Sequence, residues 1–257
     1  MLEYKDGIYE TQEKGRSVFP NVEFYKDLLG IILRASKKAK RGDYTYQEWI
    51  EDNIRVIRSL EKVGVEFNIK GIENLSLLEG RPVVVIANHM STLETFTLGG
   101  ILYPYLKVTF VVKESLVKLP VFKHIMISRN PITVTRVNPR EDLKKVLEDG
   151  TQRLSDGYSV IIFPQTTRVY EFDTKEFNSI GVKLAKRANV PVVPLALKTD
   201  CWSQGKLIKD FGKINIDKKA YFILGKPLTI EGNGQKEHKE IVSFISENLK
   251  KLDVPVL

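Results

Sequence analysis

The sequence is poor in the residues on which several classes of protein depend. A single cysteine, Cys201, among 257 residues excludes an intramolecular disulfide and a cysteine-rich metal site. No apolar run approaches the roughly 20 residues of a spanning helix; the longest are residues 28–33 and 82–87. The first residues also lack the basic start and apolar stretch of a secretory signal. We therefore expect an intracellular protein that does not cross a bilayer by an α-helix.

Motifs that mark several enzyme classes are missing as well. The sequence has no Gly-x-Ser-x-Gly elbow, no His-Glu-x-x-His, no Gly-x-Gly-x-x-Gly opening a helix and no Gly-Lys-Ser/Thr phosphate loop. Serine-nucleophile, metal and nucleotide chemistry are therefore not indicated, and we expect no cofactor. Only three histidines are present, His89, His124 and His238, so few side chains can act as a general base near neutral pH.

Positive charge, in contrast, is in excess. Lys and Arg number 40 and Asp and Glu 32, which gives a formal net charge of +8. Such an excess favours an anionic partner, which leaves nucleic acid, a membrane surface and an acidic substrate open. Hydrophobic residues make up 42% of the chain, enough for a sizeable core and too many for a disordered protein.

The character of the sequence changes near residue 65. Residues 1–64 carry two amphipathic helical patterns, and in residues 65–257 short β-rich runs alternate with helical patterns. We expect strands at 65–70, 82–87, 108–112, 132–135, 159–163, 192–197 and 220–224, and helices at 92–102, 139–155, 175–188 and 235–252. This order predicts an α/β fold with a mainly parallel sheet flanked by helices, preceded by an N-terminal two-helix element.

Chemistry-bearing residues follow four of the predicted strands. Parallel sheets bind ligands beyond the carboxyl ends of their strands. His89, Lys113, Arg136 and Arg168 each stand just after such a strand, so one histidine and three cations are expected along one edge. A histidine base beside cations suits the activation of a hydroxyl group on an anionic substrate. Each cation taken alone is better explained as ordinary surface charge than as a ligand-binding residue.

An acidic residue, Glu94, lies five positions after His89. On one continuous helix the two would point about 140° apart, so contact requires His89 to sit in the turn before the helix. A second explanation is open for Glu94, because residues 91–94, Ser-Thr-Leu-Glu, form a capping-box pattern that would start the helix. The two roles are compatible with each other.

Four blocks follow one another in the sequence: Asn88-His89 with Glu94, residues 113–116 with Pro120 and 132–136, residues 163–168, and residues 190–194. In this order they resemble the four blocks of the glycerophospholipid acyltransferases, most closely the lysophosphatidate acyltransferases. The chain departs from the family pattern in three places. Glu94 replaces an Asp, Gln165 and Thr166 replace Glu and Gly, and a glycine of the second block is replaced around Lys123-His124.

The resemblance implies transfer of a fatty acyl group from an acyl thioester, carried by acyl carrier protein or coenzyme A, to the sn-2 hydroxyl of lysophosphatidate. It makes His89 the general base and Glu94 the carboxylate that orients it. It assigns the acceptor phosphate to Lys113, Arg136, Arg168 and Thr167. Glycerol 3-phosphate or another lysophospholipid remains open as the acceptor. An alternative outside enzymology is a non-catalytic protein that binds anionic lipid. As the source of an oxyanion hole we take backbone amides near Val169.

The N-terminal helix pair offers a route to the membrane where such substrates reside. We expect its apolar residues to lie among acyl chains and its basic residues to meet anionic head groups, which would place a peripheral or monotopic protein on the cytoplasmic face of the cell membrane. These residues are Phe24, Leu28, Ile31 and Ile32, followed by Arg34, Lys37, Lys38, Lys40 and Arg41. The alternative is that both helices pack on the α/β domain. Nucleic acid is disfavoured, because the cations do not interleave with aromatics.

Overall fold

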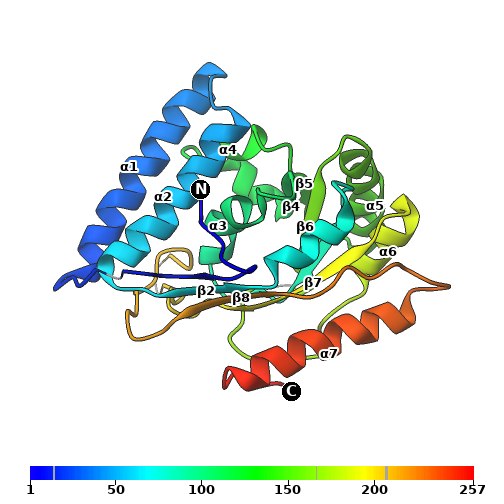
Figure 1. The fold of residues 1–257 in the computed structure, drawn as a ribbon. Coiled ribbons are helices and arrows are strands. Elements are labelled where there is room, and N and C mark those ends of the chain that lie inside the picture. The colour runs from blue at the N-terminus through cyan, green and yellow to red at the C-terminus, as the bar shows by residue number, and fades with distance from the viewer. Residues whose placement is uncertain (14, 166, 206–207) are drawn as a thin grey trace.

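A computed structural model describes the chain apart from Lys14, Thr166 and residues 206–207. Its sheet has the strand order β1-β2-β8-β7-β3-β6-β4-β5 (Figure 1). The strands are β1 (Tyr9–Glu10), β2 (Phe67–Lys70), β3 (Val84–Ala87), β4 (Val108–Lys113), β5 (Ile132–Val134), β6 (Ser159–Ile162), β7 (Val192–Lys198) and β8 (Ala220–Leu224). The α-helices are α1 (Pro20–Arg41), α2 (Tyr46–Val63), α3 (Leu93–Leu102), α4 (Lys123–Ile127), α5 (Pro139–Ser155), α6 (Ile180–Ala188) and α7 (Gln235–Lys251).

Five adjacent strands, β7, β3, β6, β4 and β5, run parallel to one another, so their carboxyl ends share one edge. Among the strands of the described residues, only β8 against β7 and β1 against β2 pair antiparallel. Along β3 the side chains alternate between the two cores. Val85 and Ala87 pack in the cluster beneath α1, α2 and α3, whereas Val84 and Ile86 pack in the cluster beneath α5, α6 and α7. The predicted α/β class with a mainly parallel sheet is confirmed.

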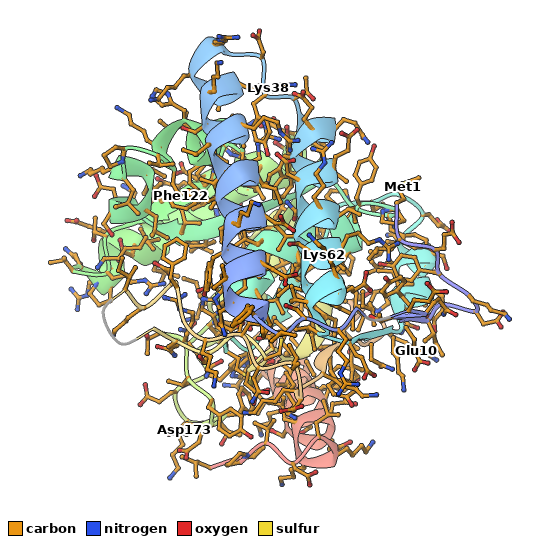
Figure 2. The ribbon with its side chains drawn as sticks, turned by 90° about the vertical axis from the view of Figure 1, so that its left-hand side faces the viewer. Met1, Glu10, Lys38, Lys62, Phe122 and Asp173 are labelled. Atoms are coloured by element: carbon orange, nitrogen blue, oxygen red, sulfur yellow. The ribbon has the colours of Figure 1, made fainter. Side chains whose placement is uncertain are left out.

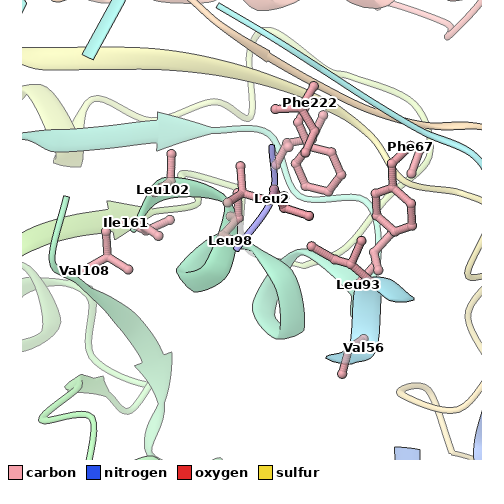
Figure 3. Close-up of a cluster of buried hydrophobic side chains, with 14 of the residues drawn as sticks. Leu2, Val56, Phe67, Leu93, Leu98, Leu102, Val108, Ile161 and Phe222 are labelled. Atoms are coloured by element: carbon pink, nitrogen blue, oxygen red, sulfur yellow. The ribbon is translucent and has the colours of Figure 1, made fainter. Parts of the chain in front are cut away.

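The core on the α2–α3 side is assembled from distant parts of the chain. Figure 3 shows Leu93, Leu98 and Leu102 of α3 gathered with Leu2 from the N-terminus and Phe222 from β8. All five are at most 5% exposed. The N-terminal segment thus completes the core on this side of the sheet.

The two N-terminal helices form a hairpin whose ends are set by local sequence. Pro20 opens α1, and Gly42, with φ 80°, ends it in the left-handed region that glycine adopts without strain. Thr45 and Glu48 form a complete capping box at the start of α2. The helices lie side by side with α1 outermost (Figure 2). No helix in the described part of the chain is long and apolar enough to span a bilayer.

The apolar stripe of α1 that we expected among acyl chains is buried instead. Phe24, Leu28 and Ile32 are at most 5% exposed, and the Phe24 ring packs edge-on against Trp202, with 4.9 Å between ring centroids. Ile31 is partly buried against the same core. The prediction that these residues contact lipid is therefore wrong for the structure described. Helical spacing shows that a stripe is apolar, but here the α/β domain covers it.

Part of the basic cluster is also engaged within the hairpin. Arg34 pairs with the buried carboxylate of Asp52, and Lys38 pairs with Glu48. Both partners belong to α2, so these two cations tie the helices together. Lys37, Lys40 and Arg41 are exposed at the end of α1.

One helix begins later than expected. α6 starts at Ile180 rather than near residue 175, because the preceding segment bonds to the C-terminus. The Phe172 N–H donates to Pro255 O, and the Leu257 N–H donates back to Phe172 O. The short β1, the 3-10 helices Ile72–Leu78 and Glu114–Lys118, and α4 were not predicted. Each is too short to show a period in the sequence.

We predict that Gly99→Ala destabilises the protein by about 1–3 kcal/mol, because the added methyl would overpack the α2–α3 interface. A Cβ at this position would lie 2.4 Å from the Trp49 ring and 2.7 Å from Asn53 Oδ1. Gly30 on α1 has nothing within 4 Å of the same atom, so Gly30→Ala should stabilise the helix by about 0.5–1 kcal/mol. Urea unfolding of the two variants measures both changes in the free energy of unfolding. Equal effects would show that the α2–α3 contact is not tight.

Candidate active site

The end of β3 is fastened to β7 by a side chain. Asn88 Nδ2 donates to Leu197 O, and the Leu197 N–H donates to Asn88 Oδ1, both at 2.8 Å. The Asn88 amide thereby continues the strand pairing by one residue beyond β3. His89 follows in the turn that leads to α3, and Glu94 lies in the first turn of that helix. His89 Nδ1 contacts Glu94 Oε2, as expected for a histidine placed before the helix.

The Glu94 carboxylate is fully buried and both of its oxygens are bonded. Oε1 accepts from the backbone N–H groups of Met90 and Ser91, each at 2.9 Å, and from the Thr199 hydroxyl. Oε2 contacts the imidazole. Of the predicted capping box only the Glu94 half is present, because Oε1 accepts from the Ser91 N–H whereas the Ser91 hydroxyl accepts from the Leu93 N–H and not from that of Glu94. The other oxygen, Oε2, contacts His89.

The loop after β6 also holds His89 in place, through its ring and through its backbone. Phe163 stacks on the imidazole with ring centroids 4.1 Å apart. The His89 N–H donates to Gln165 Oε1 at 2.8 Å, and His89 O accepts from the Val169 N–H at 3.1 Å. With Nδ1 held by a carboxylate, Nε2 is the nitrogen available to a substrate hydroxyl.

The bond to Val169 corrects one expectation. Since this amide donates to His89 O, it is not available as an oxyanion-hole donor. Thr166, which replaces a glycine of the family pattern, lies outside the described residues.

Two of the predicted cations come together at the same edge. Arg168 pairs with Asp210 at 2.6 Å and also bonds the Thr92 hydroxyl. Burial, and next the nearby charge of Arg168, lower the pKa of Arg136. The Asp142 carboxylate accepts from the backbone N–H groups of Thr135 and Arg136 and so holds this turn, in which Arg136 has φ 61°.

Lys113 and Thr167 occupy more open positions. Lys113 is the last residue of β4 and is exposed at the shared edge. Thr167 is exposed next to Arg168. The edge thus carries a carboxylate-held imidazole and two nearby guanidinium groups, with a lysine at the end of a neighbouring strand. This set can take a proton from a hydroxyl group while guanidinium groups hold a phosphate on the same molecule.

The chain also matches a known protein family over much of its length. The model of the family described as "Acyltransferase" matches residues 66–198, just over half of the chain. The chain belongs to this family. The family recognised in the sequence blocks is thereby confirmed.

The relatives of this acyltransferase carry the same activity in their names. The chain is 28% identical over 217 residues to the 1-acyl-sn-glycerol-3-phosphate acyltransferase of Pseudomonas aeruginosa, and the match covers 82% of this chain and 79% of that one. It is 30% identical over 187 residues to a probable enzyme of the same name from Mycoplasma genitalium, covering 70% and 66%. The crystal structure of the Thermotoga maritima 1-acyl-sn-glycerophosphate acyltransferase shares the fold, with TM-score 0.67, 19% identity and coverage of 92% and 95%.

An apolar cavity of about 410 Å³ adjoins the site of this acyltransferase. Its lining includes Thr92 and Asp210, the two partners of Arg168. It also includes Trp49 of α2 and Thr109 of β4. Thr109 lies four residues before the end of β4, which is about 13 Å along the strand. Ile31 and Ile32, which we expected in lipid, line this cavity.

Three residues that form hydrogen bonds or ion pairs with site residues were not predicted from the sequence to belong to the site. Thr199 is 105 residues from Glu94 in the chain, and no local pattern marks it. Asp210 is likewise remote from Arg168. Gln165 was noticed only as a departure from a motif, although its contact with the His89 N–H explains why an acceptor side chain stands there.

We predict that Glu94→Gln lowers both stability and turnover. Loss of charge on a fully buried, bonded carboxylate should cost about 1–3 kcal/mol of unfolding free energy, and loss of the imidazolium partner should lower kcat on the order of 10³-fold or more. Chemical unfolding and an acyl-transfer assay measure the two effects. Glu48→Gln, which alters the capping box of α2 away from the site, is the matched control and should change stability alone. Normal turnover in Glu94→Gln would leave only the capping role.

Proposed function

We propose that this acyltransferase moves a fatty acyl group from an acyl thioester to the sn-2 hydroxyl of lysophosphatidate and so forms phosphatidate. The observation that carries the proposal is the contact of His89 with the buried Glu94 on the sheet edge that also holds Arg136 and Arg168. The activity named for the Pseudomonas and Mycoplasma relatives supports the same acceptor. The protein needs no resident cofactor in this mechanism, because the thioester itself is a substrate.

In this mechanism His89 acts first as a base and then as an acid. Nε2 takes the proton from the sn-2 hydroxyl as the oxygen attacks the thioester carbonyl carbon. The imidazolium that forms is stabilised by Glu94 through Nδ1. Collapse of the tetrahedral intermediate breaks the C–S bond, and the thiolate that leaves takes up the proton from Nε2. The products are an ester and a free thiol, and no acyl-enzyme forms.

Arg168 and Arg136 supply the charges that would hold the acceptor phosphate. After burial, the charge of Arg168 is the next cause that lowers the pKa of Arg136, so an anion between the two guanidinium groups would be stabilising. Asp210 pairs with Arg168, so a bound phosphate would compete with this carboxylate for the arginine. Lys113 and Thr167 at the same edge complete the proposed phosphate-binding set.

The apolar cavity beside Thr92 is the place for an acyl chain. Its lining is almost entirely apolar, and its volume lies within the ~300–1,000 Å³ of ordinary small-molecule sites. The thioester donor is carried by acyl carrier protein or coenzyme A. Both are acidic, which suits the excess of positive charge on this chain.

The acceptor is tested by offering the purified protein lysophosphatidate, glycerol 3-phosphate and lysophosphatidylcholine, each with acyl-coenzyme A and with acyl carrier protein thioester. We expect phosphatidate from lysophosphatidate, and a rate about 10²–10⁴-fold lower in His89→Ala because the base is lost. Release of free thiol and formation of ester are measured together. Preferred acylation of glycerol 3-phosphate or lysophosphatidylcholine would reassign the acceptor, and a folded His89→Ala protein with full activity would refute the mechanism.

We further propose that the outer face of α1 binds the membrane. Five apolar residues on and just before this helix are 54–84% exposed: Val18, Phe19, Val22, Leu29 and Leu33. Lys37, Lys40 and Arg41 follow at the end of the helix and are exposed as well. An apolar face with cations at one end suits an anionic lipid surface. The protein would then be peripheral or monotopic, and the cytoplasmic face of the cell membrane is the proposed location.

Flotation with liposomes tests this face. Each exposed leucine that enters the lipid contributes about 1.5–3 kcal/mol, so the double variant Leu29→Gln, Leu33→Gln should bind anionic vesicles far more weakly than the unaltered protein. The matched control is Leu77→Gln, which changes a residue 57% exposed in a different part of the fold. Undiminished flotation of the double variant would exclude α1 as the anchor.

A further inference from the structure

We propose that Thr199, the residue after β7, is a positioning residue that acts on catalysis through Glu94. The proposal rests on the function proposed above, in which Glu94 must hold His89 in one orientation. Thr199 is fully buried, and its hydroxyl lies against Oε1 of the fully buried Glu94. It therefore touches the group that orients the base, and it touches neither substrate nor the imidazole.

The direction of each hydrogen bond around Thr199 follows from the chemistry of the groups. Glu94 Oε1 already accepts from the backbone N–H groups of Met90 and Ser91, so it acts as an acceptor and the Thr199 hydroxyl hydrogen points to it. The Thr199 oxygen then accepts from the Ser91 hydroxyl at 2.9 Å, and the Ser91 oxygen accepts from the Leu93 N–H at 3.2 Å. The chain of donors has a single arrangement, and it ends on the carboxylate.

The bonds to Glu94 come from two separate parts of the fold. The Met90 and Ser91 amides belong to the turn that the carboxylate itself caps, so they move with it. Thr199 instead belongs to the segment directly after β7, the strand to which Asn88 is bonded through Leu197. Thr199 also donates its backbone N–H to the Met90 sulfur at 3.3 Å. Thr199 is therefore the contact that fixes the carboxylate relative to the sheet.

The surroundings of Glu94 make this contact matter more than its single bond suggests. The carboxylate has none of its surface exposed, so water cannot replace a donor that is lost. Its partners in the described structure are three uncharged donors and the imidazole. Without the Thr199 hydroxyl, Oε1 loses the one donor that approaches from β7. The carboxylate can then rotate, and Oε2 no longer holds Nδ1 in the reactive geometry.

The test compares Thr199→Val, which keeps the shape and removes the hydroxyl, with Thr199→Ser, which keeps the hydroxyl. We expect Thr199→Val to lower kcat by about tenfold to a hundredfold, the effect of a lost hydrogen bond to a charged group. KM for lysophosphatidate should stay within about twofold, because the phosphate-binding arginines are untouched. Thr199→Ser should recover most of the turnover.

Thr97→Val is the matched control. Thr97 is also fully buried, and its hydroxyl bonds only to Leu93 O within α3. It should lower stability by an amount similar to that of Thr199→Val while leaving kcat of the folded protein unchanged. If Thr199→Val fails to fold, Thr199→Ala removes the same hydroxyl without adding a second methyl and is read in the same way.

Three results would overturn the proposal: equal kcat in Thr199→Val and Thr97→Val, a rise in KM with kcat unchanged, or no recovery in Thr199→Ser. These are distinct from failure of the proposed function. If the unaltered protein does not acylate lysophosphatidate but acylates another acceptor, the same comparison of kcat is made with that acceptor. If it transfers no acyl group to any acceptor offered, the proposed function and this inference fail together.

Discussion

A buried carboxylate that must stay ionised is costly, and the local architecture of this acyltransferase is arranged around that of Glu94. Its oxygens collect two backbone amides from the turn before α3, a hydroxyl from the end of β7 and the imidazole of His89. These donors compensate for the lost hydration of the carboxylate only if the three segments that carry them are held within hydrogen-bonding distance of it. The side-chain amide of Asn88, one residue before His89, helps to hold these segments in place because it bonds the end of β3 to β7.

The same requirement explains which parts of the site are legible in the sequence. His89 and Glu94 are five residues apart, so a local argument about helix geometry is enough to bring them together. The cations after β4, β5 and β6 are equally accessible to reasoning, because parallel strands put their carboxyl ends on one edge. Thr199 is 105 residues from Glu94 in the chain and Asp210 is 42 residues from Arg168, and a polar residue near a strand end or in a loop carries no sign of its partner.

The N-terminal helices show a different limit. The spacing of Phe24, Leu28 and Ile32 correctly marks a continuous apolar face, and such a face is equally suited to a bilayer and to a protein core. In this fold the α/β domain covers it, and Ile32 lines the apolar cavity as well. The residues left exposed on α1, such as Leu29 and Leu33, fall between the positions of that stripe. Amphipathic periodicity thus locates the helix and its inner face, while the surface that meets the inner face is set by tertiary packing.

Gln165 shows how a departure from a family pattern can preserve geometry while changing charge. The family pattern has Glu at this position, and the side chain here is 5% exposed and accepts the His89 N–H at 2.8 Å. A carboxylate and an amide oxygen can both accept that bond, so His89 is held either way. A carboxylate, however, would place a second buried negative charge beside the one on Glu94, and each such charge requires its own compensation. With Gln165, the site avoids a second buried negative charge at this position.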